Sequence, residues 1–164
     1  MFDSTLLQAA ETLLDLCRKE RKTLACAESC TGGLITAILT AVPGSSDVVD
    51  RGFVTYSNGA KSEMLGVDPH MIERHGAVSA EVARAMAQGA IRHSAADVAV
   101  SVTGIAGPGG ATPGKPVGLV FIGWMQRGGV PMAARHVFEG DRQAIREAAA
   151  REVITTTFVD AVRR

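Results

Sequence analysis

Aromatic side chains, net charge and long apolar runs are all scarce in this 164-residue sequence. Phe, Trp and Tyr together make up 4% of it, so small aliphatic side chains have to form most of the core. Lys and Arg number 17, as do Asp and Glu, and the resulting zero net charge disfavours a protein whose main task is to grip bare nucleic acid. No apolar run approaches the roughly 18 residues that a membrane-spanning helix needs.

Cysteine is sparse as well. The three cysteines, Cys17, Cys26 and Cys30, form an odd set that is typical of reduced thiols in a cytosol. No further Cys or His completes a zinc set with Cys26 and Cys30. The first residues, Met-Phe-Asp-Ser, lack the basic and then apolar pattern of a signal peptide. We therefore expect a cytoplasmic protein without a metal ion.

What the sequence does contain is a regular alternation of helical and strand-like segments. Strands are predicted over residues 23–27, 52–56, 97–102, 117–125 and 132–138, and helices begin near residues 6, 34, 61, 69, 80 and 141. Helices interleave with strands early in the chain, and a hairpin comes late. The predicted fold is therefore α/β, a three-layer α/β/α sandwich with a mixed β-sheet, in a single domain over residues 1–164.

Polar and glycine-rich segments follow directly on the predicted strands, which is where open α/β sheets bind ligands. Residues 28–33 (ESCTGG) form either an anion site of backbone N–H groups and hydroxyls or only a helix cap and turn. Residues 103–110 (TGIAGPGG) begin two nucleotide motifs and complete neither, because Pro116 replaces the Ser or Thr of a P-loop and Thr112 replaces the third glycine of a dinucleotide fingerprint. That segment is a ligand-covering loop or a structural turn.

Residues 45–61 bring serines and a lysine into one turn–strand–helix unit. Serine and lysine form a known nucleophile–base pair, provided that the lysine loses its proton. Its pKa must then fall from about 10.4 towards roughly 7–8, through burial or a neighbouring cation. The alternative is that these are ordinary surface side chains. Near the C-terminus, Asp141 and Arg142 stand at a predicted helix start. They either cap this helix, or the guanidinium of Arg142 binds a phosphate or carboxylate through two parallel hydrogen bonds.

Seven segments together resemble the CinA C-terminal domain family, in family order and over nearly the whole chain. They are AESCTGG (27–33), GSS (44–46), RGFVTYSN (51–58) with Lys61, GAVS (76–79), SVTGIAGPGG (101–110), KPVG (115–118) and GDR (140–142). Stand-alone members of this family are nicotinamide-nucleotide amidohydrolases. The resemblance implies hydrolysis of the carboxamide of nicotinamide mononucleotide to nicotinate mononucleotide and ammonia, in bacterial pyridine nucleotide salvage. It implies neither a metal nor an organic cofactor.

The same resemblance assigns the catalytic roles to Ser46, Tyr56 and Lys61, with Thr103 and Arg142 as further site residues. We expect Ser46 to attack the carboxamide carbon, Lys61 to take its proton, and Tyr56 to relay the proton or orient the groups. Backbone N–H groups near Ser46, or in the turn at Thr103, would hold the oxyanion. The remaining residues predicted to bind substrate are Ser29, Thr31, Gly32, Gly33, Asn58 and Gly104.

Several alternatives stay open at this point. Ser29 is a rival nucleophile, because it too lies at a predicted strand-to-helix turn. The phosphate cradle is either the turn at residues 31–33 or Arg142. Deamidation of nicotinamide mononucleotide, of nicotinamide riboside or of free nicotinamide would need similar protein groups, so the substrate range stays open. A non-catalytic nucleotide-sensing or interaction module, linked to competence or DNA damage, is the competing function. In either case we expect a homo-oligomer with no membrane partner and no nucleic acid.

Overall fold

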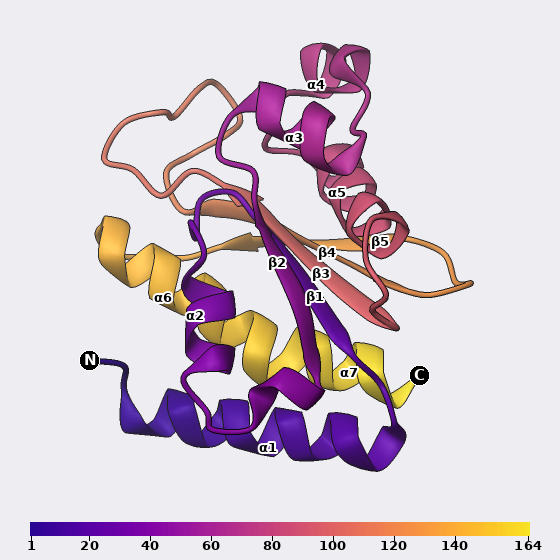
Figure 1. The fold of residues 1–164 in the computed structure, drawn as a ribbon. Helices are drawn as coiled ribbons and strands as arrows, with labels where there is room; N and C mark the ends of the chain where they lie inside the picture. The colour runs from indigo at the N-terminus through magenta and orange to yellow at the C-terminus, as the bar shows by residue number, and fades with distance from the viewer.

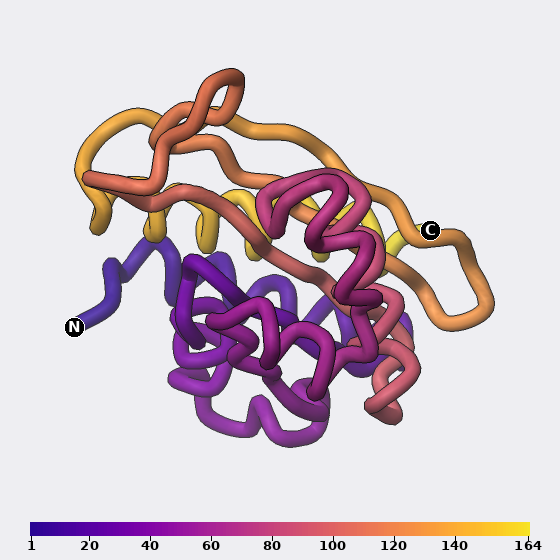
Figure 2. The backbone as a smooth tube through the Cα atoms, turned by 90° about the horizontal axis from the view of Figure 1, so that it is seen from above, coloured from indigo at the N-terminus to yellow at the C-terminus, as the bar shows by residue number.

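A computed structural model describes all residues 1–164 and contains one five-stranded sheet (Figure 1). Its strands are β1 (Leu24–Glu28), β2 (Val49–Val54), β3 (Val98–Gly104), β4 (Leu119–Gln126) and β5 (Met132–Val137), in the spatial order β2-β1-β3-β4-β5. β1 pairs in parallel with both β2 and β3, whereas β4 is antiparallel to β3 and to β5. The predicted mixed sheet with a late hairpin is therefore confirmed. Figure 2 shows that hairpin extending beyond the rest of the chain.

Helices cover both faces of this sheet, which confirms the three-layer α/β/α architecture. One face carries α1 (Ser4–Glu20), α2 (Leu34–Thr40), α6 (Arg142–Glu152), the π-helical turn η2 (Val153–Thr157) and α7 (Phe158–Arg163). The other carries α3 (Asn58–Leu65), α4 (Pro69–His75) and α5 (Ala80–Arg92). A short 3-10 turn, η1 (Ser45–Asp47), joins α2 to β2. None of these helices combines the length and the apolar character needed to cross a bilayer.

Short polar side chains determine where most of these helices begin. Asp3, Ser57, Asp68, Ser79 and Asp141 each accept a hydrogen bond from an N–H group in the first turn that follows. The starts predicted for α5 and α6 are therefore correct. β2 begins at residue 49, three residues ahead of the predicted strand.

Two apolar clusters hold the layers together, and small side chains dominate the contact with α5. Ala25, Ala27 and Ala99 of the sheet pack against that helix. All three cysteines are free and buried, and they belong to the larger cluster on the opposite face. Small residues allow the helices to approach closely, which agrees with the shortage of aromatic side chains in the sequence.

Replacing Gly89 by alanine should destabilise the fold by a net amount of about 1 kcal/mol. A Cβ at this position of α5 would overlap the backbone carbonyl of Leu65 at the end of α3. Overpacking costs about 1–3 kcal/mol, and a backbone contact relaxes poorly, so we expect the cost to exceed the roughly 1 kcal/mol that alanine gains in helix propensity. Urea unfolding measures the difference. Gly59→Ala in α3 is the matched control, because its new Cβ meets nothing closer than 3.9 Å. Equal stability of the two variants would contradict this packing.

Candidate functional site

The candidate site lies where the carboxyl ends of β1 and β2 meet α3, in the upper part of Figure 1. Ser29 directly follows β1, and Lys61 lies on α3, 32 residues further along the chain. The Nζ atom of Lys61 is 3.0 Å from the Oγ atom of Ser29 and 2.9 Å from the carbonyl oxygen of Thr55. Both distances are in hydrogen-bond range. The fold therefore brings an amine and a hydroxyl into direct contact.

Burial makes this amine unusual. Lys61 is only 1% exposed, and no carboxylate forms an ion pair with it. Desolvation penalises the charged ammonium and lowers the pKa of Lys61 from its ordinary value of 10.5, while the neighbouring Cys30 thiol opposes the shift. A neutral amine carries a lone pair that can accept the proton of a hydroxyl. Burial that lowers the pKa and contact with a hydroxyl are the two features that a lysine general base requires, and Lys61 has both.

A buried carboxylate, Glu28, closes the loop that carries Ser29. Glu28 ends β1 and is 1% exposed. One of its oxygens accepts from the N–H groups of Gly33 and Ile35, each at 3.1 Å. The other accepts from the N–H group of Thr36 at 2.9 Å and from its hydroxyl at 2.8 Å. The carboxylate thus satisfies N–H groups that the first turn of α2 leaves without partners, and it fixes the end of β1 against that helix.

Glu28→Gln should cost about 3 kcal/mol of unfolding free energy. A glutamine amide has one oxygen and one NH2 group, so its nitrogen would face N–H donors that it cannot satisfy. Hydrogen bonds to a charged group contribute about 1.5–3 kcal/mol, and an unpaired buried donor costs about 1–3 kcal/mol. Urea unfolding at pH 7 tests this, with Glu63→Gln on the exposed side of α3 as control. A loss below about 1 kcal/mol would show that the loop closes without the carboxylate.

The turn after Ser29 contains three of the predicted binding residues. Gly32 donates its N–H to the carbonyl oxygen of Ser29 at 2.9 Å. Gly32 and Gly33 have φ values of +59° and +95°, a region that glycine enters without steric cost. Thr31 is fully buried, and its hydroxyl has no hydrogen-bond partner. The backbone conformation of the turn is therefore fixed by its glycines and by this hydrogen bond, yet the Thr31 hydroxyl, two residues after Ser29, is left without a partner.

A second part of the site is built around Arg142, the first residue of α6. Its guanidinium donates to the phenol oxygen of Tyr56 and to the carbonyl oxygen of Gly107, each at 2.8 Å. Tyr56 is 61% exposed, so its ring is available at the surface. The arginine thereby joins the segment after β2 to the long loop between β3 and β4. Tyr56 is bonded to Arg142 rather than to Lys61, which favours an orienting role over a proton relay.

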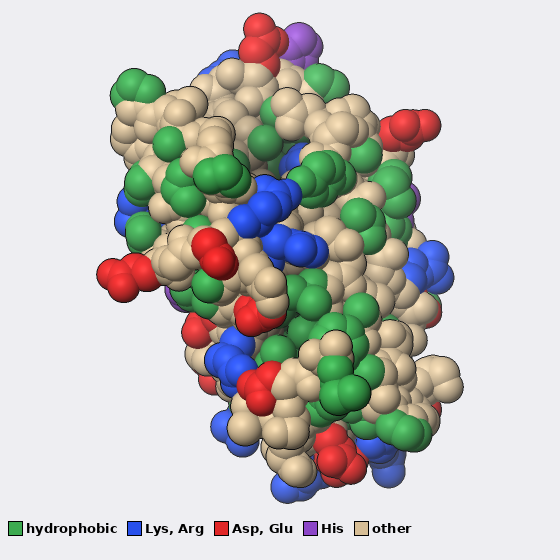
Figure 3. Space-filling model, turned by 90° about the vertical axis from the view of Figure 1, so that its left-hand side faces the viewer, with side chains coloured by type: hydrophobic (Ala, Val, Ile, Leu, Met, Phe, Trp, Pro, Cys, Tyr) green, Lys and Arg blue, Asp and Glu red, His purple; other side chains and the backbone are tan.

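Beside this arginine lies a cavity of about 550 Å³ between the β3–β4 loop and the start of α6. Its lining residues are Ala106, Pro108, Val117, Gly140, Asp141, Arg142 and Gln143. The face of the molecule seen in Figure 3 is hollowed, and Lys and Arg side chains gather beside the hollow among apolar ones. A volume of this size and character suits a ligand with an apolar ring and an anionic group.

The remaining predicted residues occupy different positions. Thr103, near the end of β3, donates its hydroxyl to the carbonyl oxygen of Ala77 at 2.8 Å. A Cβ on Gly104 would lie 2.7 Å from a methyl group of Val120, 2.9 Å from the carbonyl oxygen of Leu119 and 3.1 Å from the sulfur of Cys30. This glycine therefore lets both β4 and the turn after Ser29 pack closely on the end of β3. Asn58 begins α3, is exposed, and lines a different cavity of about 420 Å³ between α3 and α4.

Ser46, expected to be the nucleophile, is not brought to Lys61. It is exposed in η1, before β2, whereas Lys61 follows that strand. β2 has six residues, and at about 3.3 Å per residue it spans roughly 20 Å. The neighbours of Ser46 are instead tied to α1, because Arg18 donates to the carboxylate of Asp47 at 2.8 Å and to the carbonyl oxygen of Gly44 at 3.2 Å. The geometry therefore favours Ser29, the alternative nucleophile.

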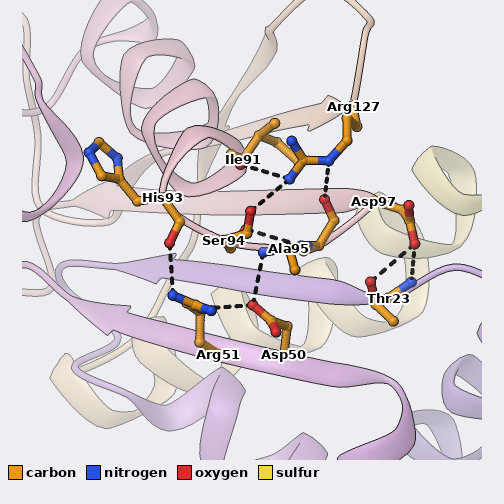
Figure 4. A network of polar contacts seen from close by, with 10 residues as sticks. Thr23, Asp50, Arg51, Ile91, His93, Ser94, Ala95, Asp97 and Arg127 are labelled. Carbon is orange, nitrogen blue, oxygen red and sulfur yellow. Dashed lines mark hydrogen bonds and ion pairs between the residues drawn. The ribbon is translucent and has the colours of Figure 1, made fainter.

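Polar side chains near the amino-terminal end of β2 bind backbone groups of the segment between α5 and β3 (Figure 4). Arg51 donates to the carbonyl oxygen of His93 at 2.9 Å, and Asp50 accepts from the N–H group of Ala95 at 3.2 Å. Arg127, between β4 and β5, donates to the carbonyl oxygens of Ile91 and Ser94 at the end of α5 and to that of Ala96. A cation at a helix carboxyl end is favourable, so this network stabilises the α5–β3 connection.

Sequence reasoning gave no role to two residues that shape the site. Glu28 could have been noticed as a lone carboxylate at the end of an otherwise apolar strand. Arg146 lies one helical turn after Arg142 and so on the same face of α6, a spacing that the sequence already shows. Its guanidinium donates to the carbonyl oxygens of Cys30 and Thr31, at 3.1 and 2.8 Å. Both residues act on the backbone that carries Ser29.

Curated proteins similar to this chain include a named amidohydrolase, CinA-like proteins and proteins named as competence-damage inducible. The nicotinamide-nucleotide amidohydrolase PncC of Enterobacter agglomerans is 54% identical over 125 residues, which are 76% of this chain and 76% of that protein. A CinA-like protein of Chlorobium phaeovibrioides is 57% identical over 117 residues, covering 71% of this chain and 27% of that protein. The chain thus spans about a third or less of the length of the CinA-like relatives that it matches.

Solved structures show the same arrangement of elements. The competence/damage inducible protein CihA of Agrobacterium tumefaciens superposes with a TM-score of 0.94 at 41% identity, over 100% of this chain and 99% of that one. A CinA superfamily protein of Escherichia coli gives 0.88 at 32% identity, over 99% and 94% of the two chains. The family described as the CinA C-terminal domain matches residues 6–158. Because the family match spans most of the chain, and the fold and the relatives agree with it, the chain belongs to the CinA C-terminal domain family.

Proposed function

We propose that this chain hydrolyses the carboxamide of nicotinamide mononucleotide to nicotinate mononucleotide and ammonia, as a step of pyridine nucleotide salvage. The observation that carries the proposal is the buried Lys61 amine at 3.0 Å from the Ser29 hydroxyl. The relative named as a nicotinamide-nucleotide amidohydrolase supports the choice of substrate. We assign the nucleophile to Ser29 instead of Ser46, because Ser29 alone of the two contacts the base.

The reaction then proceeds through a covalent ester. The Ser29 oxygen attacks the carboxamide carbon, and its proton passes to the neutral Nζ of Lys61. Lys61 returns this proton to the nitrogen as the carbon–nitrogen bond breaks, so that ammonia leaves. Water next attacks the ester carbonyl and gives its proton to Lys61, which restores the serine hydroxyl and releases the carboxylate. Every step uses groups of this chain, the substrate and water.

Recognition of the rest of the substrate falls to the second part of the site. The exposed ring of Tyr56 offers a face for the pyridinium, since a cation over an aromatic ring is attracted by its quadrupole. Arg142 holds the phenol oxygen of Tyr56 and borders the 550 Å³ cavity, where it can also meet a phosphate. Tyr56 therefore orients the substrate, while Lys61 moves the protons.

Ammonia release by the purified protein after EDTA treatment tests the proposal. Nicotinamide mononucleotide, nicotinamide riboside and free nicotinamide are the three substrates to compare. We expect release from the mononucleotide and much less from the free base, because only the mononucleotide reaches both parts of the site. Binding of the mononucleotide without ammonia release would contradict the proposal and support a nucleotide-sensing module.

A further inference from the structure

We propose that the N–H groups of Cys30 and Thr31 bind the oxyanion that forms when Ser29 attacks a carbonyl carbon, and that Arg146 is the positioning residue that holds them in place. This inference rests on the proposed function and deepens it. It replaces the expectation that the oxyanion donors lie near Ser46 or in the turn at Thr103.

Neither N–H group is hydrogen-bonded to another residue, and the N–H of Cys30 meets only the thiol of its own side chain. The backbone hydrogen bonds of the turn include the N–H groups of Ser29 and Gly32, but neither that of Cys30 nor that of Thr31 has an acceptor on another residue. Buried polar groups nearly always have partners, and an unpaired donor next to a nucleophile therefore calls for a ligand. Thr31 also carries the buried hydroxyl that lacks a partner. In serine hydrolases the N–H group of the residue after the nucleophile is a standard oxyanion donor.

Two hydrogen bonds determine where these donors point. A trans peptide is planar, so its C=O and N–H bonds point in opposite directions. The carbonyl of the Ser29–Cys30 peptide accepts from Gly32, which directs the N–H of Cys30 away from that residue. The carbonyl of the Cys30–Thr31 peptide accepts from Nε of Arg146 at 3.1 Å, which directs the N–H of Thr31 away from the guanidinium.

Arg146 contributes more than geometry. Its Nη2 atom also donates to the carbonyl oxygen of Thr31 at 2.8 Å, so one rigid guanidinium holds two successive carbonyls. A cation bound to a carbonyl polarises that peptide and strengthens the N–H donor on its other side. Such prearranged donors act most strongly on charge that develops only in the transition state. Removing Arg146 should therefore reduce kcat more than it raises KM.

Arg146→Ala tests the assignment in two reactions. With nicotinamide mononucleotide we expect kcat to fall about 100-fold and KM to change less than about threefold. In p-nitrophenyl acetate, Ser29 would displace p-nitrophenolate and take the acetyl group, a step that needs the oxyanion donors but no nucleotide recognition. Its acylation rate should fall by a similar factor. Millimolar guanidinium should restore at least about tenfold in both reactions, because it can refill the vacated position.

Two further variants make the outcome specific. Arg146→Lys, which can hold one carbonyl but lacks the fork, should give an intermediate kcat. Arg151→Ala removes a guanidinium from the same helix, where it pairs with Asp3 at the surface, and should leave both rates unchanged. An unchanged kcat in Arg146→Ala, or a loss confined to KM, would overturn the assignment while leaving the proposed function intact.

Failure of the proposed function itself looks different. If the unmodified protein releases no ammonia from the mononucleotide but is acetylated on Ser29 by the ester, the substrate is wrong and the ester series still decides the role of Arg146. A protein that neither hydrolyses the amide nor acetylates Ser29 would overturn both the mechanism and the oxyanion assignment.

Discussion

Lys61→Met should lose amide hydrolysis by about 10⁴-fold or more and yet remain at least as stable as the unmodified protein. The activity is lost because methionine has no lone pair basic enough to take the Ser29 proton. Stability is retained because methionine fills a similar volume without a charge that must be desolvated. Ammonia release and urea unfolding at pH 7 measure the two effects. Lys19→Met, on the exposed side of α1, should change neither.

The stability difference between these proteins should depend on pH. Burial lowers the pKa of Lys61 in the folded protein, whereas the unfolded chain keeps a value near 10.5. Between these two values the unfolded chain binds more protons, so the unmodified protein gains stability as pH rises and carries its full penalty below the lowered pKa. The excess stability of Lys61→Met should accordingly shrink as pH rises, while kcat/KM of the unmodified protein rises through the same lowered pKa. A difference that stays constant from pH 6 to roughly 10 would contradict a buried, neutral Lys61.

Ser29→Ala should lose turnover about as completely as Lys61→Met, by about 10⁴-fold or more, because a nucleophile and its base act as one unit. Ser46→Ala should retain activity within about twofold, since Ser46 lies beyond the far end of β2. Ammonia release from nicotinamide mononucleotide compares the two directly.

Binding of nicotinamide mononucleotide provides the control for this pair. Calorimetry should show that Ser29→Ala still binds the ligand, because the Arg142 and Tyr56 side of the site is unaltered. The opposite pattern, with Ser46→Ala inactive and Ser29→Ala active, would return the nucleophile to the position first expected.

The alternation of elements was predictable because apolar periodicity and caps are local signals. Asp141 and Ser79 are N-caps that predict the start of α6 and α5, and the short apolar run at residues 24–28 predicts β1. Lys61 and Arg142 were predicted as site residues through the resemblance to a family. What brings Lys61 to the Ser29 hydroxyl, however, is the parallel pairing of β1 with β2, which is a contact between distant parts of the chain.

The separation of Ser46 from Lys61 has a simple topological cause. Ser46 and Lys61 are close in sequence, but a strand separates them, and a strand carries its two flanking segments to opposite ends of a sheet. Ser29 and Lys61 are farther apart in sequence, yet both follow parallel strands and therefore meet at one end. The rule that ligands bind at the carboxyl ends of strands already favoured Ser29. Glu28 and Arg146 could not be assigned roles in advance, because their partners are backbone groups whose positions depend on the folded turn.

Labelling of the three buried cysteines would measure how often parts of this protein open to solvent. Burial raises the pKa of Cys17 to about 12 and that of Cys30 to about 11, so the folded protein presents almost no thiolate to a labelling reagent at neutral pH. Labelling must then wait for an opening motion. Cys17 lies on the long helix α1, whereas Cys30 lies in the turn that follows Ser29. The ratio of their labelling rates would distinguish local opening of the turn after Ser29 from unfolding of the whole protein, without any added probe.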